Sequence, residues 1–577
     1  MAPPEGPTAA TITIAETLEL LDRHAREVAD GVANGRYALR LGSGISMNSV
    51  PGLSGAVRNV LELLQAHADT ADPMCVHHKA LKAAIKIARL RRQELDALDL
   101  TKPVGEWANL EQILDNLVGR YSELLDIRLA GTRQDYLLWE GVDIKATYAA
   151  VAEPGSEHLC VAILALEGAV HEIPSANWDG LIETATRELA ESPEQALHVV
   201  VLGEDFRDTS TAPRLLKFHG CAVLAAQDES RYRAALVGAR SQITGWPEQD
   251  ESKVMCNALK MLATERRTLM IGLSAQDTDI QDVFLKAKSL MPWTWPTTPP
   301  AYVFAEQEIG SDQQNLLRVV YREQYEQHGP EIEASALIQA YAEPLLVALV
   351  LAVLERKLTA YIAEARAPGI PQTERETLAH GISHIRDRVA ERFEPDRLGA
   401  TRRMIQAQSR ALGMFRTGEE PAVTETVYRP LSNTPADRIA IDPELATSGL
   451  PGLATALGIL GTGDAAGHWT LGVQPTGSKM PGALTVTGGT GADAAIHFAA
   501  NAGAAIRQEK LPSVATDPGR TIMIHSTRPV TGAPRSPRGS FGRTGHAAIR
   551  HIDMEALLDT CTGAAELEEH FRLAAAI

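Results

Sequence analysis

Apolar runs alternate with amphipathic stretches along much of the chain. The run RYALRL, at residues 36–41, has the length and composition of a buried strand. The same features recur in HLCVAILAL (158–166), ALHVVVLGEDF (196–206), RTLMIGLS (267–274) and PAYVFAEQ (300–307). Helical periodicity separates these runs, so right-handed crossovers can join them in one sheet. The pattern predicts an α/β fold with a doubly wound, Rossmann-like parallel sheet.

Helical spacing divides the chain around this sheet. Apolar positions repeat at helical intervals in an N-terminal helix within residues 1–36 and in an insertion at about 76–130. We therefore expect the main sheet to lie in residues 37–330. A helical connector is expected over residues 331–376.

The composition changes after APGIPQTE (367–374), where Gly, Ala, Thr and Pro become more frequent. Residues 482–506 have the pattern of a strand, a Gly-rich turn and a helix. RTIMIHST (520–527) predicts another strand, and residues 554–576 have helical periodicity. We expect a second, smaller α/β domain over residues 377–577.

Bulk properties exclude several classes of protein. The chain has 577 residues and a formal net charge of -18, so phosphate backbones would repel it in general. Its five cysteines are far apart and form no CxxC pair, which predicts free thiols in a reducing compartment and no metal site. These cysteines are Cys75, Cys160, Cys221, Cys256 and Cys561.

No segment has the length of a membrane span. The N-terminus has neither the basic start nor the apolar core of a secretory signal. The most apolar run, Leu345 to Leu354, has ten residues, whereas a bilayer needs about twenty. We expect a cytoplasmic protein in which this run forms either a core helix or a subunit interface of a homo-oligomer.

A Gly-rich segment follows the first predicted strand. In GSGIS, the residues Gly42, Ser43, Gly44 and Ser46 stand where backbone N–H groups at a strand-to-helix turn can bind phosphate. Met47 occupies the position of the third glycine in the GxGxxG fingerprint. An ordinary tight turn therefore explains this segment equally well when it is taken alone.

Three other segments place polar or small residues where an apolar run ends. They are IPSANWDGLIETA (173–185), LLKFHGCAV (215–223) and LMIGLSAQDTDI (269–280). The carboxyl ends of parallel strands meet at one edge of a doubly wound sheet, and ligands bind in the crevice there. We expect these segments and GSGIS to line one site.

In this order and spacing the four segments resemble the sirtuin family, over roughly residues 37–310. GSGIS resembles the first NAD-binding loop, Asn177 and Asp179 match the Asn-x-Asp element, and His219 matches the catalytic histidine. IGLSAQDTDI is similar to the later NAD-binding segment of sirtuin-like domains in bacterial defence proteins. Its residues in register are Gly272, Ser274, Asp277 and Asp279.

Two departures from the sirtuin deacylases indicate which reaction the resemblance implies. The four-cysteine zinc module is absent from the sequence, and MNSVPGLSGAVRNVL (47–61) lacks the Pro-Asp-Phe-Arg element. Both departures favour an NAD hydrolase, with NAD as substrate and no metal. An NAD-dependent protein deacylase and a non-catalytic sensor of NAD or ADP-ribose remain as alternatives.

Each residue of the site also has a structural interpretation. Asn177 is expected to orient a ribose hydroxyl or a water, and His219 to act as a general base, but a histidine at a strand end can be purely structural. Asp179 is expected to orient the ribose or its own loop. Asp277 and Asp279 can cap a helix as well as bind a cofactor. Trp178 is expected to pack beneath the loop rather than stack on the ligand.

The C-terminal region carries two further candidate features. TVTGGTGAD (485–493) suits either a phosphate-binding turn or a plain strand-to-helix connection, and the connection is the favoured interpretation. Five arginines without an acidic residue among them can bind an acidic partner or nucleic acid, or form a solvated loop. They are Arg528, Arg535, Arg538, Arg543 and Arg550.

The family resemblance also implies a biological setting. Sirtuin-like NAD hydrolases of bacterial antiphage defence deplete cellular NAD after infection is sensed, in the manner of abortive infection. Related proteins act as oligomers or with a second protein, such as a HerA-type ATPase or a short Argonaute. In this interpretation the domain at 377–577 serves sensing or assembly.

Overall fold

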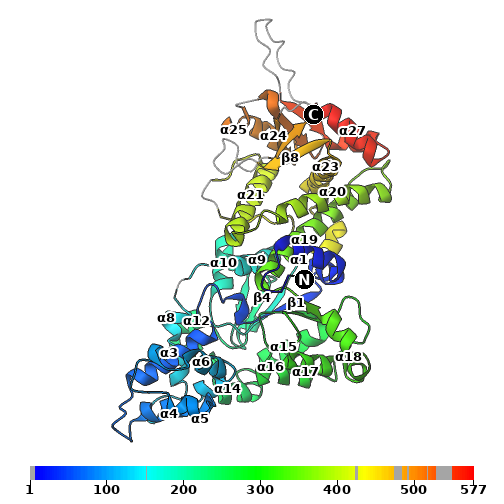
Figure 1. Ribbon diagram of the computed structural model, residues 1–577. Helices are drawn as coiled ribbons and strands as arrows, with labels where there is room; N and C mark the ends of the chain where they lie inside the picture. The colour runs from blue at the N-terminus through cyan, green and yellow to red at the C-terminus, as the bar shows by residue number, and fades with distance from the viewer. Residues whose placement is uncertain are drawn as a thin grey trace, which may run out of the picture.

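A computed structural model describes residues 7–150, 152–422, 426–473, 484–489, 493–515, 518–527 and 549–577. Two sheets are separated by a long helix, and each sheet has helices on its sides (Figure 1). The candidate site belongs to the larger sheet.

The larger sheet has seven strands in the order β3-β4-β2-β1-β5-β6-β7, and all of its pairings are parallel. This confirms the predicted Rossmann-like fold. The strands are β1 (Tyr37–Leu41), β2 (Glu172–Ser175), β3 (His198–Val200), β4 (Arg214–Lys217), β5 (Arg267–Ile271), β6 (Tyr302–Ala305) and β7 (Leu337–Ile338).

Both faces of this sheet are buried, because alternate side chains of its strands enter two different cores. Leu269 and Ile271 of β5 face one core, and Met270 faces the other. The first core includes α1 (Ile14–Arg23), α2 (Arg26–Ala33), α9 (Ser156–Leu166), α10 (Leu181–Leu189) and α19 (Ala342–Glu364). The second includes α15 (Lys253–Glu265), α16 (Thr278–Ala287), α17 (Ser311–Tyr321) and α18 (Glu323–Ala336).

Helices also make up most of the long connection between β1 and β2 and lie in the shorter connections between the other strands. The long connection contains α3 (Leu53–Ala66), α4 (Val76–Ile87), α5 (Arg92–Asp96), α6 (Leu110–Val118), α7 (Tyr121–Leu125) and α8 (Ile144–Thr147). Elsewhere lie α11 (Pro193–Ala196), α12 (Ala222–Gln227), α13 (Glu229–Tyr232) and α14 (Arg240–Gly245). The helices α3 to α6 lie to the lower left of the larger sheet, and α4 and α5 are the farthest from it (Figure 1).

The prediction of a strand in HLCVAILAL is wrong, because this run lies in the helix α9. Its residues from Ser156 to Ala165 are all buried, since α10 and α19 cover the helix on the sides away from the sheet. A helix buried on every side has no polar stripe, so its sequence looks like that of a buried strand.

The smaller sheet has the order β12-β11-β10-β9-β8 and is mixed. Its strands are β8 (Trp469–Val473), β9 (Leu484–Gly488), β10 (Asp493–Ala499), β11 (Thr521–His525) and β12 (Arg550–Asp553). The accompanying helices are α20 (Gln372–Ala390), α21 (Arg397–Thr417), α22 (Leu445–Ser448), α23 (Leu450–Ala465), α24 (Ala502–Glu509), α25 (Pro512–Ala515), α26 (Met554–Thr560) and α27 (Ala564–Ala575).

The strand, turn and helix predicted for residues 482–506 need a correction. Strands β9 and β10 are antiparallel neighbours, and the helix α24 follows only after β10. The segment TVTGGTGAD therefore contains the end of β9 and the first residue of β10, and the predicted connection from a strand to a helix is wrong. Residues 490–492, on which the phosphate-binding interpretation depends, lie outside the described residues. Of the five arginines, Arg550 begins β12, and the other four lie outside the described residues.

The helix α19 contains the apolar run of residues 345–354 and packs against both halves of the molecule. It contacts α1, α2 and α9 on one side and α20 and α23 on the other. Leu349 has no exposed surface, and the side chains from Leu345 to Val353 are all buried in the chain itself. The run is thus ordinary core, and its interpretation as a subunit interface is wrong.

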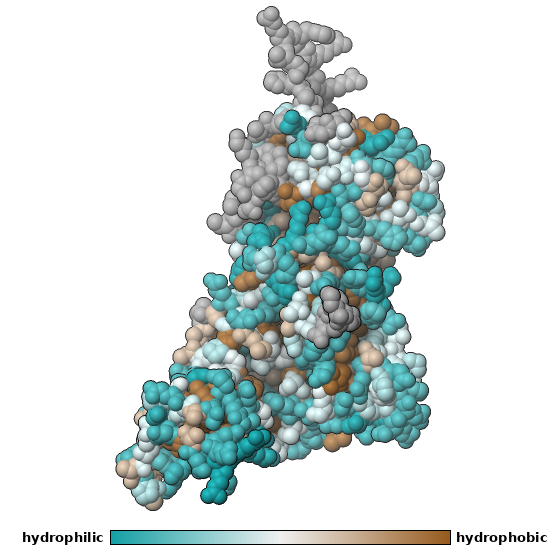
Figure 2. Space-filling model, viewed as in Figure 1, coloured by the Kyte–Doolittle hydropathy of each residue, from teal (hydrophilic) through white to brown (hydrophobic). Residues whose placement is uncertain are grey.

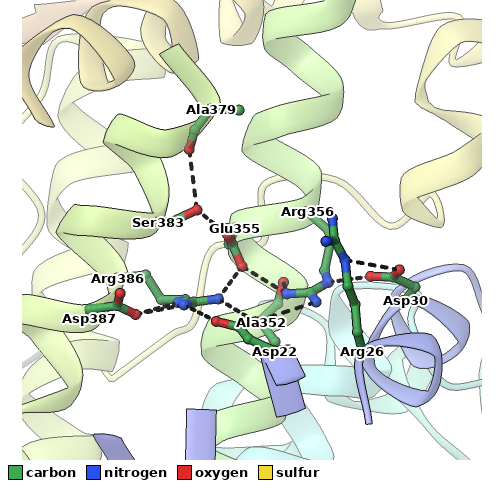
Figure 3. A network of polar contacts seen from close by, with 10 residues as sticks. All are labelled: Asp22, Arg26, Asp30, Ala352, Glu355, Arg356, Ala379, Ser383, Arg386 and Asp387. Atoms are coloured by element: carbon green, nitrogen blue, oxygen red, sulfur yellow. Dashed lines mark hydrogen bonds and ion pairs between the residues drawn. The ribbon is translucent and has the colours of Figure 1, made fainter. Parts of the chain in front are cut away.

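A network of charged side chains surrounds the middle of α19 (Figure 3). Arg386 of α20 pairs with Asp22 of α1 at 2.6 Å and with Glu355 of α19 at 2.5 Å. Arg356 of α19 pairs with Asp30 of α2 at 2.8 Å. The network therefore links the N-terminal helices to α19 and to the first helix of the C-terminal half.

The outer surface visible in Figure 2 is mostly hydrophilic, with smaller hydrophobic areas between. Among the described residues, no helix combines the length and the apolar character that crossing a bilayer requires.

Candidate functional site

A pocket of about 700 Å³ opens at the carboxyl edge of the larger sheet. Loops after β1, β2, β4, β5 and β6 form its walls, together with the start of α19. Nine of the eleven residues predicted for the site line this pocket, and Gly42 and Asp279 do not. The nine are Ser43, Gly44, Ser46, Asn177, Asp179, His219, Gly272, Ser274 and Asp277. The structure thus brings together segments that are far apart in the sequence.

Gly42 does not line the pocket and packs against the loop that follows β5. Its N–H donates to the carbonyl of Ile271 at 3.1 Å. A Cβ atom on Gly42 would stand 2.3 Å from the carbonyl oxygen of Gly272, and one on Gly44 would stand 2.5 Å from the Gly272 Cα. These glycines let the two loops approach each other closely, which holds the loops at the pocket in place.

The Gly-rich loop continues as a short 3-10 turn (Ser43–Ile45), and α3 begins only at Leu53. The predicted strand-to-helix turn is therefore a longer loop. Ser46 lies at the end of this 3-10 turn, is buried, and faces Asn177.

Ser46, Asn177 and His158 form a chain of hydrogen bonds beneath the pocket. Nδ1 of His158 accepts the N–H of Gly155 at 3.1 Å, so the neutral ring carries its hydrogen on Nε2 and donates it to Ser46 Oγ at 3.0 Å. Burial lowers the pKa of His158 to about 4, which keeps the ring neutral near pH 7.

Ser46 Oγ also accepts a hydrogen bond from Asn177 Nδ2 at 3.1 Å. With two bonds accepted, its own hydrogen remains as a donor for a ligand. Asn177 Oδ1 is buried and has no hydrogen-bond partner among the described residues. A buried orphan acceptor is costly unless a ligand or water satisfies it. Together these two groups offer a donor and an acceptor, which suits a hydroxyl group of a sugar or a water.

The rest of the Asn-Trp-Asp element supports its loop. Trp178 packs edge-on to Tyr148 and donates from Nε1 to the carbonyl of Val237 at 3.1 Å. Asp179 Oδ1 accepts the N–H of Leu181 at 3.1 Å, at the start of α10. Asp179 therefore has a turn-forming role in addition to its place on the pocket wall.

A buried ion pair joins His219, after β4, to Asp279 in the first turn of α16. His219 Nε2 lies 2.8 Å from Asp279 Oδ2, and both side chains are almost completely buried. Burial alone would lower the pKa of His219, but the carboxylates of Asp279 and Asp277 outweigh it and raise the pKa. Because Nε2 is paired, Nδ1 is the nitrogen left for a ligand.

Asp277 and Asp279 do not cap α16 in the predicted way. Asp277 is the residue before the helix, but its carboxylate makes no capping bond and accepts the hydroxyl of Tyr121 at 2.9 Å. Asp279 Oδ1 instead accepts the backbone N–H of its neighbour Ile280 at 2.8 Å, and Oδ2 forms the ion pair with His219. The helix insertion thus contributes Tyr121 to the site.

Three residues of this site were not predicted from the sequence: Tyr121, Glu157 and His158. Tyr121 and Glu157 line the pocket, and His158 lies behind it. Glu157 and His158 lie in the first turn of α9. Because the apolar run of this helix predicts a strand, the sequence does not predict that these two residues lie at the carboxyl edge of the sheet. Recognising Gly155 and Ser156 as a helix start would have placed them there.

Glu157 is a buried carboxyl group in the wall of the pocket. Burial, with Glu343 nearby, raises its pKa to about 7. A carboxyl group that titrates near neutral pH is unusual outside functional sites.

Replacing Glu157 by Gln is expected to stabilise the protein at pH 8 by roughly 2–3 kcal/mol. The raised pKa means that ionisation of Glu157 is less favourable in the folded state than in the unfolded state. The carboxyl group therefore lowers the free energy of unfolding increasingly as pH rises from about 4.5 to about 7, and by a constant amount above pH 7. The gain should therefore disappear toward pH 4.5. Thermal unfolding at the two pH values measures it, with the exposed Glu111→Gln as control. An unchanged midpoint at pH 8 would contradict the burial of this charge.

Residues 171–327 match the family model described as a SIR2-like domain. This range runs from the start of β2 into α18 and contains Asn177, Asp179, His219 and the loop after β5, while GSGIS lies before it. No curated protein matches the chain. Residues 171–327, which include the strands β2 to β6 and part of the pocket wall, therefore form a SIR2-like, that is sirtuin-like, domain.

Proposed function

We propose that this protein is an NAD glycohydrolase. Water cleaves the bond between nicotinamide and ribose, and the products are nicotinamide, ADP-ribose and one proton. The observation that carries the proposal is the convergence of the four sirtuin-like segments on one pocket. Its volume of about 700 Å³ lies in the range of pockets for ligands of this class.

Each polar group of the pocket has a role in this proposal. Asn177 Oδ1 accepts a hydrogen bond from a ribose hydroxyl or from the attacking water, and Ser46 donates one. Nicotinamide leaves as a neutral base and needs no proton. His219, in its neutral form, accepts the proton of the water or of a ribose hydroxyl at Nδ1. Asp179 holds the loop and adds negative charge near the sugar, where the transition state is positive.

The loops with Gly44, Gly272, Ser274 and Asp277 are proposed to bind the remainder of NAD. Backbone N–H groups in such loops suit a diphosphate. Asp277 suits a sugar hydroxyl, because its carboxylate is a hydrogen-bond acceptor. It accepts a hydrogen bond from the hydroxyl of Tyr121 in this structure.

We further propose a setting for this activity. The resemblance to bacterial defence proteins supports a cytoplasmic effector that depletes NAD after infection, as a homo-oligomer or with a HerA-type ATPase or short Argonaute. Residues 37–330 would then carry the hydrolase and residues 331–376 the connection. Residues 377–577 would serve sensing or assembly.

The test is to incubate the full-length protein with NAD and quantify nicotinamide and ADP-ribose. Asn177→Ala is expected to lower the rate at least tenfold, because it removes the acceptor and one of the two hydrogen bonds that hold Ser46. NAD binding is measured in the same samples by calorimetry. Gln134→Ala, an exposed change outside the pocket, is the matched control.

Three outcomes separate the alternatives. Release of ADP-ribose without a peptide supports hydrolysis. Release of O-acetyl-ADP-ribose that depends on an acyl-lysine peptide supports the deacylase. Binding without turnover, also when the neighbouring genes are co-expressed, supports the sensor and contradicts the hydrolase.

A further inference from the structure

Exposed cations follow one another along the helix α4 and through the turn from α4 to α5. This basic stripe consists of Lys79, Lys82, Lys86, Arg89, Arg91 and Arg92. Its lysines recur at intervals of three and four residues, so they share one side of the helix. The opposite side of α4 is buried, and the helix packs against α3 and α6. The basic stripe therefore faces outward.

The charges of the basic stripe are not balanced by carboxylates. Residues 73–93 contain neither Asp nor Glu. Asp72 and Glu94 flank this range, but their carboxylates accept the backbone N–H groups of Met74 and Arg91. Arg58 and Arg133, in the same connection between β1 and β2, each pair with a glutamate. By contrast, no carboxylate in the part of the chain that the structure describes forms an ion pair with the stripe.

The position of α4 lets the basic stripe act independently of the acidic remainder of the chain. Like charges three and four residues apart on a helix repel each other, and no contact described above relieves this repulsion. The helices α4 and α5 lie far from the larger sheet, at one end of the molecule (Figure 1). Charges more than about 8 Å away are largely screened at physiological salt. The negative net charge of the chain therefore does not cancel the positive potential at the stripe, and a polyanion would lower the repulsion.

The residue types of the stripe favour the backbone of a nucleic-acid duplex as this polyanion. Lysine is depleted at protein interfaces, where aromatic anchors are enriched. Residues 73–93 contain no Phe, Trp or Tyr. A single strand would also require aromatic side chains on which its bases could stack. The phosphates of a duplex require only closely spaced cations.

We propose that the basic stripe binds the phosphate backbone of a nucleic-acid duplex, without preference for base sequence. Its lysines and arginines would displace counterions from the phosphates, so affinity falls steeply as the salt concentration rises. DNA and RNA duplexes share this chemistry, and the experiment compares them. The activity is independent of the proposed NAD cleavage, because none of the six residues lines the pocket of the larger sheet.

The test uses the full-length protein and fluorescein-labelled DNA and RNA duplexes of mixed sequence. Fluorescence anisotropy measures binding between about 50 and 200 mM NaCl. One variant combines Lys79→Gln, Lys82→Gln and Lys86→Gln, because glutamine keeps the helix propensity but has no charge. We expect it to bind at least about tenfold more weakly at the lowest salt concentration, and the slope of log K against log salt to be smaller by about three.

Two control variants separate the stripe from the net charge of the chain. The first changes the net charge equally, at exposed lysines elsewhere, and should bind like the wild type: Lys253→Gln, Lys288→Gln and Lys510→Gln. The second replaces the three lysines of α4 by arginine and should retain the affinity, because the charges remain. Thermal unfolding midpoints show whether each variant folds.

Several results would overturn the proposal. The wild type would fail to bind either duplex at low salt, or the arginine variant would lose the affinity although it folds. An equal loss in the two glutamine variants would assign binding to the overall charge of the chain. Tighter binding to a single strand, to phosphatidylserine vesicles or to polyglutamate than to the duplexes would assign the stripe to that ligand instead.

Discussion

Replacing Asp279 by Asn is expected to lower NAD cleavage by about 10²–10³-fold and to move the acid limb of the pH profile to lower pH. In the folded protein the carboxylate of Asp279, 2.8 Å from His219 Nε2, outweighs the effect of burial and raises the pKa of the histidine. In the proposed reaction His219 acts as a base only when neutral, so turnover in the wild type should rise with pH through an inflection above 6.5.

In the Asp279→Asn variant the new amide side chain would remain close to His219 but would carry no charge. Burial is then the largest remaining influence, and it lowers the pKa of the histidine below its usual value. The maximal rate falls because the ring loses the partner that orients it and that stabilises the protonated form. The pH dependence of kcat/KM measures both effects.

Two controls define what would contradict this expectation. Asp282→Asn lies on the same helix, α16, but its carboxylate pairs with Lys286 at the surface and should leave the profile unchanged. His219→Gln should lose the acid limb altogether, because no titrating base remains. An inflection that stays in place in Asp279→Asn would show that His219 is not the group that titrates.

The local pattern of the sequence predicts strands well where an apolar run is short and bounded by turns. RYALRL and RTLMIGLS are parallel strands of one sheet, as expected, and the structure shows that they are neighbours in it. The run at 158–166 is a helix, because a sheet on one side and α10 and α19 on the others bury it completely. The strand β7, with only Leu337 and Ile338, has too few residues to produce a pattern.

The candidate site shows a similar division. Motif order placed Asn177, His219 and Ser274 at one edge, since the topology of a parallel sheet determines where strand ends meet. The partners of these residues were not predictable in the same way. His158 reaches Ser46 across 112 residues, and Asp279 reaches His219 across 60, and no local pattern encodes such contacts. Their assignment needs the packed structure.

Replacing Lys357 by Met is expected to destabilise the protein by about 3–5 kcal/mol, which is the usual cost of leaving one member of a buried ion pair alone. Lys357 Nζ lies 2.8 Å from Glu167 Oε2, and neither side chain has more than 1% exposure. Glu167 Oε1 accepts further bonds from Tyr428 and Leu431, at 2.6 and 3.0 Å. These contacts tie α9, α19 and the segment after α21 together.

Urea unfolding followed by circular dichroism measures this loss, and a second change identifies its cause. In the double variant Lys357→Met with Glu167→Gln the unpaired charge is gone, so part of the stability should return. Lys286→Met is the control, because its pairs with Glu248 and Asp282 are at the surface and should contribute at most about 1 kcal/mol. Lys357→Met would cost no more than this control only if Glu167 were not left buried and unpaired. That result would contradict a stabilising role of the ion pair at this junction.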